Sequence, residues 1–158
     1  MAYYRDLTPC DYFHGKGLTA VGWLEPEHAF EAGPVPPPFL DALRRLLAFP
    51  WFPFGMAGPH QCGFCKSVYG SENLLVPGAY ELYASPAMIL HYIEVHQYRP
   101  PQVFQEAVLA CPATHTKAYF DRIEGSRFLA ACEKICPGLR GYHAKASRRF
   151  QDMRDSIS

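Results

Sequence analysis

The sequence contains no uninterrupted apolar stretch near the roughly 20 residues that cross a bilayer as a helix. Its most apolar segment, FLDALRRLLAFPWFPFGM, is broken by charged residues and prolines. The first residues, MAYYRDLTPCDYF, also lack the basic lead and the apolar run of a secretory signal. These absences argue against a membrane protein and against an exported one, so we expect a cytoplasmic protein.

Other absences limit the chemistry. The sequence has no glycine-rich phosphate-binding loop, and its serines lack the surroundings of a nucleophile elbow. The net charge is zero, because 15 Lys and Arg balance 15 Asp and Glu, whereas a dedicated DNA-binding protein usually shows a basic excess. The short basic segment RGYHAKASRRFQDMR is interpreted first as a solvated helix face. A nucleic-acid-binding finger is therefore only the third hypothesis for this chain.

What the sequence does contain is apolar and aromatic residues, at 49% and 15% of 158 residues. This composition is too apolar for a disordered chain, and the length suffices to bury about two thirds of the unfolded surface. No internal repeat is visible. We therefore expect a single domain over residues 1–158, with a metal subsite at about 60–98 and a helical C-terminal part at about 101–150.

Patterns along the chain predict several elements. A strand is expected at about 18–24, and PPFLDALRRLLAF has the apolar spacing of an amphipathic helix. NLLVPGAYELYA predicts a hairpin that turns at Pro77–Gly78. Ser85 is expected to cap a helix with Pro86 in its first position, and that helix continues through AMILHYIEVH.

The segment RPP is expected to end that helix and to start another one over QVFQEAVLA. A last long helix is predicted over about 116–136, where Pro137 and Gly138 end it. Few strands, several helices and long loops together predict a small mixed α+β domain, in which a zinc-finger-like knuckle and a hairpin lie against several helices.

The cysteines and histidines predict a metal site. Cys62 and Cys65 form a CxxC pair, in which Gly63 gives the turn its backbone freedom. His91 and His96 follow on the predicted helix, with the spacing that often completes a Cys2His2 zinc site. Because mixed thiolate and imidazole ligands suit zinc in a reducing compartment, Zn²⁺ is the expected ion.

Two features of this spacing depart from an ordinary zinc finger. His91 and His96 are five residues apart, about 140° around an ideal helix, so the last turn must loosen for both to reach one ion. The gap from Cys65 to His91 is also longer than usual. His60, two residues before Cys62, could replace either helical histidine as a ligand.

Three alternative interpretations remain open at this site and beside it. The CxxC pair could be redox-active, although a thioredoxin-like motif would follow a strand and open a helix. If one histidine is not a ligand, an open zinc site could use Glu94 as general base, which would make the protein an enzyme. Finally, a second cluster could bind an ion; it consists of Cys111, His115, Cys132 and Cys136. The favoured interpretation is that these cysteines are buried and structural.

Three stretches, LTAVGWLEPEHAFEAG, HQCGFC and YASPAMILHYIEVHQYRPPQVFQEAV, resemble a family of short bacterial proteins that share a domain of unknown function. The resemblance rests on the CxFC pair and above all on the HYIExHxYxPP block. It covers roughly residues 3–112 and not the tail beyond Pro112. It implies a bacterial origin, and it implies no activity and no catalytic residue.

The sequence therefore predicts a small zinc-binding protein whose ion is structural. Its expected role is protein interaction or an accessory function, with an immunity-like protein as one form of it. A zinc enzyme with Glu94 as base is the alternative. PWFPFGM, residues 50–56, is either an exposed aromatic patch for a protein partner or core filling, which is slightly favoured.

Overall fold

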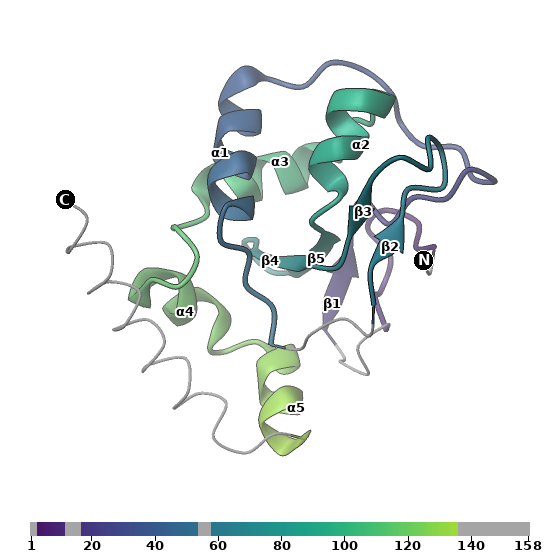
Figure 1. Cartoon of the computed structure of the whole chain (residues 1–158). Helices are drawn as coiled ribbons and strands as arrows, with labels where there is room; N and C mark the ends of the chain where they lie inside the picture. The colour runs from purple at the N-terminus through teal and green to yellow at the C-terminus, as the bar shows by residue number, and fades with distance from the viewer. Residues whose placement is uncertain (1–2, 12–16, 54–57, 136–158) are drawn as a thin grey trace.

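The structure is a computed structural model that describes residues 3–11, 17–53 and 58–135 (Figure 1). One helix and several short strands are followed by a run of helices, which confirms the predicted small α+β domain. In chain order the elements are β1 (Leu18–Ala20), α1 (Pro37–Leu47), β2 (His60–Gln61), β3 (Tyr69–Gly70), β4 (Asn73–Pro77), β5 (Leu82–Pro86), α2 (Ile89–His96), α3 (Gln102–Ala110), α4 (Lys117–Ile123) and α5 (Arg127–Ile135). The basic segment at 140–154, Cys136 and residues 54–56 of the aromatic segment lie outside the described residues.

A three-stranded sheet in the order β1-β5-β4 forms the centre of the described structure (Figure 1). β5 pairs with β4 in the antiparallel sense and with β1 in the parallel sense, so that Leu18 lies opposite Leu82. The chain before β1 continues this ladder, because Cys10 donates its N–H to the carbonyl of Leu18 and Ala20 donates to that of Thr8. β2 and β3 form a separate two-stranded antiparallel sheet.

The predicted hairpin is confirmed, with its turn at Pro77–Gly78. The N–H of Gly78 donates to the carbonyl of Glu81 over 2.8 Å and closes the turn. A Cβ atom at Gly78 would lie 2.8 Å from the ring of Tyr83, so the side chain of any other residue would collide with this tyrosine. The turn therefore requires glycine because of packing.

The hairpin divides the interior because both of its faces are covered. Leu74 and Val76 of β4 face a core built mainly with α1, α2 and α3, while Leu75 faces a second core with α4 and α5. We call these the upper core and the lower core. The upper core includes Phe39, Leu43, Leu46, Ile89, Tyr92 and Phe104, and the lower core includes Trp23, Trp51, Ala84, Tyr119, Phe128 and Cys132.

Two other predictions about local structure have clear outcomes. The helix predicted over PPFLDALRRLLAF is α1, whose first turn holds two prolines and whose buried face includes Phe39 and Leu43. The first part of the segment PWFPFGM is core filling, since Trp51 is buried and Phe52 contacts the lower core. The interpretation of PWFPFGM as core filling is therefore confirmed for these two residues.

The predicted start of the histidine-bearing helix is wrong. Ser85 and Pro86 belong to β5, where Asn73 pairs with Pro86 at the end of the ladder. α2 begins only at Ile89, and no side chain caps its N-terminus. β1 pairs with β5 only as far as Ala84, so at Pro86 the strand has one neighbour and tolerates proline as an edge strand does. Ser-Pro therefore suits both this strand end and a helix start.

The predicted long helix over 116–136 is two helices, α4 and α5, separated by a turn at Glu124–Gly125. Thr116 caps α4 by accepting the N–H of Tyr119. Breaking the helix turns α5 so that Phe128, Leu129 and Cys132 enter the lower core. Within the described ranges, none of these helices has both the length and the apolar character needed to cross a bilayer.

Candidate metal centre

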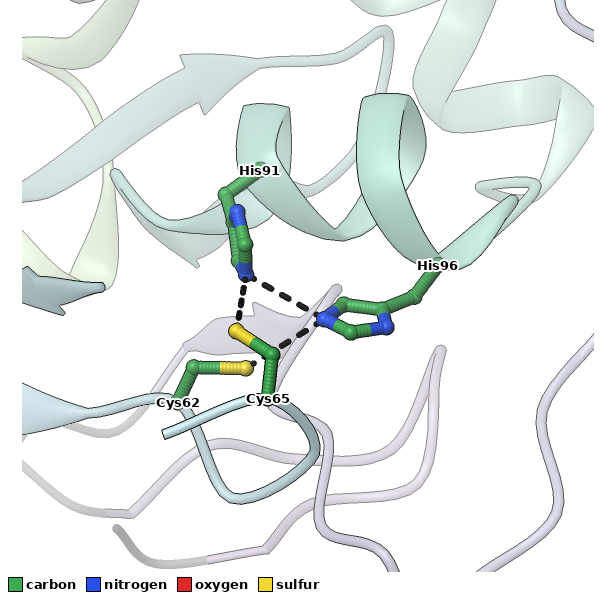
Figure 2. Close-up of side chains that lie close together, drawn as sticks. All are labelled: Cys62, Cys65, His91 and His96. Carbon is green, nitrogen blue, oxygen red and sulfur yellow. Dashed lines mark hydrogen bonds between the residues drawn. The ribbon is translucent and has the colours of Figure 1, made fainter. Parts of the chain in front are cut away.

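Two segments meet at the candidate metal centre. The first is the loop after β2, with Cys62 and Cys65, and the second is α2, with His91 near its start and His96 at its end. Figure 2 shows both imidazole rings extending from the helix towards the two thiols. One ligand atom from each of the four side chains lies within 4.8 Å of all the others. The structure therefore brings all four predicted residues together.

Three of the six distances between these ligand atoms match the edges of a tetrahedral zinc site. His91 Nε2 and His96 Nε2 are 3.2 Å apart, and each is 3.4 Å from one sulfur, Cys65 Sγ and Cys62 Sγ respectively (Figure 2). From the usual Zn–S and Zn–N bond lengths, a tetrahedral site has N···N edges of about 3.3 Å and S···N edges of about 3.5 Å. The four side chains could therefore hold one metal ion.

The last turn of α2 is widened, which lets the two histidines meet. The N–H of Gln97 donates to the carbonyl of Tyr92, five residues back, instead of four, and the N–H of Tyr98 donates to the same carbonyl. Gln97 itself is left-handed, with φ of 57°. A turn closed over five residues is π-like and holds more residues per turn. This widening reduces the angle of about 140° between positions 91 and 96 of an ideal helix.

A tight loop presents the two cysteines. The N–H of Cys62 donates to the carbonyl of Val68, and the N–H of Lys66 donates to the carbonyl of Cys62. Lys66 is left-handed, with φ of 57°. A Cβ atom at Gly63 would lie 2.8 Å from the ring of Pro26, so glycine is required here by close packing against the proline-rich loop.

The two thiols differ in their surroundings. Cys62 is fully buried, whereas Cys65 is exposed. The hydroxyl and the backbone N–H of Ser67 hydrogen-bond to Cys65 and, with smaller contributions from His96 and Cys62, lower the pKa of its thiol to about 5. A thiolate is the form that binds metal. Sequence reasoning missed Ser67, although a hydroxyl two residues after a ligand cysteine is a usable signal.

Aromatic packing holds His96 in place. Phe64, inside the CxxC pair, contacts the rings of His96, Tyr92 and Phe30. Just after the widened turn, Tyr98 is buried and donates its hydroxyl to the carboxylate of Asp6 over 2.8 Å. The end of α2 is therefore fixed from both sides, by the cysteine loop and by the N-terminal segment.

Two residues considered at the sequence level lie elsewhere. His60 is in β2 and is not among the four clustered side chains; its Nε2 is buried without a hydrogen-bond partner among the described residues, and burial lowers its pKa. Glu94 is exposed, and its carboxylate accepts a hydrogen bond from Arg44 of α1 over 2.7 Å. Neither side chain belongs to the tetrahedral group.

The second cysteine cluster does not form among the described residues, where the four side chains above are the one potential metal group. Burial raises the pKa of Cys111 to about 12 and that of Cys132 to about 11, so both stay protonated at neutral pH. Protonated buried thiols behave as small apolar side chains. This agrees with the favoured structural interpretation, and Cys136 lies outside the described residues.

Comparison with known proteins gives a family and no more specific relative. No curated protein and no solved structure matches the chain. A family described as "Domain of unknown function (DUF7919)" matches residues 2–109. That range contains both halves of the metal centre, the whole sheet and most of α3. Because the match spans well over half of the chain, the protein belongs to the family of the domain of unknown function DUF7919.

Proposed function

We propose that the protein is a small zinc-binding protein whose ion is structural and whose role is protein interaction or an accessory function. The observation that carries the first part is the convergence of Cys62, Cys65, His91 and His96 at distances that suit a tetrahedral ion. Thiolate and imidazole ligands in such a geometry favour zinc over hard cations such as Mg²⁺ or Ca²⁺.

A structural role follows from the number of ligands and from what the ion would connect. Four protein ligands fill a tetrahedral zinc and leave no position for water or substrate. β2 and β3 contain only two residues each, so they form a sheet too small to be stable alone. An ion bound to Cys62 and Cys65 would tie this small sheet to α2 through His91 and His96.

The test is the metal content of the purified, reduced protein, followed by replacement of its ion with Co²⁺. We expect one zinc per chain, and a cobalt form with the intense visible absorption of a tetrahedral site with thiolate ligands. A chain without metal, which also fails to take up Zn²⁺ after reduction, would contradict the proposal. Weak cobalt absorption, typical of six-coordinate oxygen ligands, would contradict the assigned ligands.

The interaction part of the proposal is supported by apolar side chains exposed near the metal centre. Tyr69 of β3 and Val95 of α2 are 61% and 57% exposed. Side chains of this kind gain most when a partner covers them, and aromatic residues are enriched in interfaces. An immunity-like accessory protein remains one form that this role could take.

One observation favours the enzyme as a second candidate. A surface depression of about 450 Å³ beside the metal centre is lined by His91, Glu94 and Glu72, among others. A substrate could therefore approach the ion from this side. However, a general base must reach the water on the metal, and Glu94 is instead bound to Arg44.

Glu94→Gln tests whether the Glu94 carboxylate takes part in binding the ion. If the site is structural, the variant loses only an exposed ion pair, so we expect full zinc content and a loss of at most about 1 kcal/mol in the free energy of unfolding. Urea denaturation and elemental analysis measure both quantities. Glu72→Gln, on the same depression, is the matched control. A clear fall in zinc content in Glu94→Gln alone would show that Glu94 is a ligand of the ion, so that the four clustered residues would not be the full ligand set.

A further inference from the structure

A second depression, of about 620 Å³, lies where the N-terminal segment, the β4–β5 turn and α3 meet. Its wall includes Leu7, Tyr80 and Val103, three of the large apolar side chains that are exposed in the described structure. Tyr80 is fully exposed, and Leu7 and Val103 are 46% and 47% exposed. We call this depression the hairpin-turn groove. It contains none of the four candidate metal ligands.

The floor of the groove is apolar and its charged rim is acidic. Tyr83, Ala107 and Ala110 line the floor. Glu81 and Glu106 stand at the rim, and neither forms an ion pair with a described residue. Burial, and to a smaller extent the negative charges of Glu81 and Glu106, raise the pKa of Tyr83.

The one cation in the lining does not neutralise this rim. Arg122 donates from its guanidinium to the carbonyls of Ala110 and Pro77. These bonds hold it against the ends of α3 and β4, where it forms no ion pair with a described carboxylate. Glu81 therefore remains available to a cation from outside. Glu106 accepts a hydrogen bond from Gln102 on one carboxylate oxygen over 3.1 Å, and its other oxygen remains available.

The backbone holds Leu7 in a costly conformation at this groove. Its φ is 63°, in the left-handed region that a leucine rarely occupies, while its N–H donates to the carbonyl of Ala20 over 2.9 Å. Such conformations cost about 1–3 kcal/mol and gather at functional sites. The side chain of Leu7 is nevertheless exposed at the groove, so its burial in the core does not offset the cost of this backbone conformation.

We propose that the hairpin-turn groove is the docking surface for a segment of a protein partner that combines apolar side chains with lysine or arginine. The apolar residues would cover Leu7 and Val103, and the cation would lie between Glu81 and Glu106. Tyr80 and Tyr83 add ring faces that attract cations. The inference rests on the interaction role proposed above, but it does not depend on which ion the metal centre holds.

The test uses two short fluorescent amphipathic peptides of equal length, one of Leu and Lys and the other of Leu and Glu, with the full-length metal-loaded protein. We expect fluorescence anisotropy to show saturable binding of the Leu/Lys peptide alone. The double variant Glu81→Gln, Glu106→Gln is expected to weaken this binding about tenfold, because each lost contact pairs a partly desolvated charge. Val103→Asp is expected to weaken it through the apolar wall.

The matched control is the double variant Glu27→Gln, Glu72→Gln, which removes the same charge at exposed positions outside the groove. Equal weakening in the control, equal binding of both peptides, or no binding at all would each overturn the proposal. So would a concentration-dependent dimer that Val103→Asp dissociates, since the groove would then hold a second copy. Zinc content measured on the same samples separates failure of the docking surface from failure of the metal site.

Discussion

Replacing Cys62 by serine is expected to abolish stoichiometric zinc binding and to lower the thermal transition by more than about 10 °C. Cys62 is fully buried, and its sulfur lies 3.4 Å from His96 Nε2. Zinc binding to a structural site stabilises the folded state, because the unfolded chain has no preformed site. Loss of one thiolate ligand therefore removes much of this stabilisation. For a chain of this size each 1 kcal/mol corresponds to about 2–4 °C, so a loss of several kcal/mol gives this shift.

Trypsin offers a local measurement of the same change. Lys66 lies in the cysteine loop, and the sequence has no other Lys or Arg between Arg45 and Arg99. With zinc bound, the loop should resist cleavage even though Lys66 is exposed. In Cys62→Ser the loop is no longer tied to α2, so we expect rapid cleavage after Lys66.

Cys132→Ser is the control for this variant. Cys132 is equally buried, but it contacts the lower core and no candidate ligand. Its serine variant should lose some stability from packing and keep one zinc per chain. If Cys62→Ser keeps its zinc and Lys66 stays protected, Cys62 is not a ligand and the structural site has to be assigned differently.

Trp23→Ala is expected to lower the free energy of unfolding by about 3–5 kcal/mol, the usual loss when a large buried aromatic side chain is truncated. Trp23 is fully buried in the lower core, and its indole N–H donates to the carbonyl of Ala84 in β5 over 2.9 Å. Urea denaturation measures the loss. The variant should still bind one zinc, because the metal centre adjoins the upper core.

The control for the tryptophan is Tyr80→Ala, which removes a large aromatic side chain that is fully exposed. Its free energy of unfolding should change by no more than about 0.5 kcal/mol. If Trp23→Ala lowered the free energy of unfolding equally little, the neighbouring side chains of the lower core would have to fill the space that the indole leaves. If it also released the zinc, the two cores would have to unfold as a single unit in which the metal centre depends on both.

The sequence contained enough to predict the four residues that meet at the candidate metal centre, because each pair has a recognisable spacing. It also indicated that the last turn of the helix must loosen, since positions 91 and 96 lie about 140° apart around an ideal helix. The loosening itself, with Gln97 left-handed, depends on contacts that come from distant residues. Asp6, which binds Tyr98, is 92 positions away, and no local pattern reveals that contact.

The errors in the helix boundaries have a similar origin. Ser85–Pro86 is a good helix start by local chemistry, but pairing of β5 with β4 extends the strand to Pro86. Gly125 is tolerated inside a helical pattern, yet packing in the lower core favours a break beside it. The parallel pairing of β1 with β5 could not be predicted, because the paired residues are far apart in sequence.

The way in which both edges of the central sheet are covered bears on self-association. Along β1, the preceding segment occupies the outer backbone groups of Leu18 and Ala20. Along β4, Leu75 donates its N–H to Trp51 and accepts a hydrogen bond from the Tyr119 hydroxyl. Exposed edges are the usual template for aggregation and for amyloid growth. The folded protein should therefore resist adding strands from other chains, and the same contacts leave side chains, not backbone, as its means of recognising a partner.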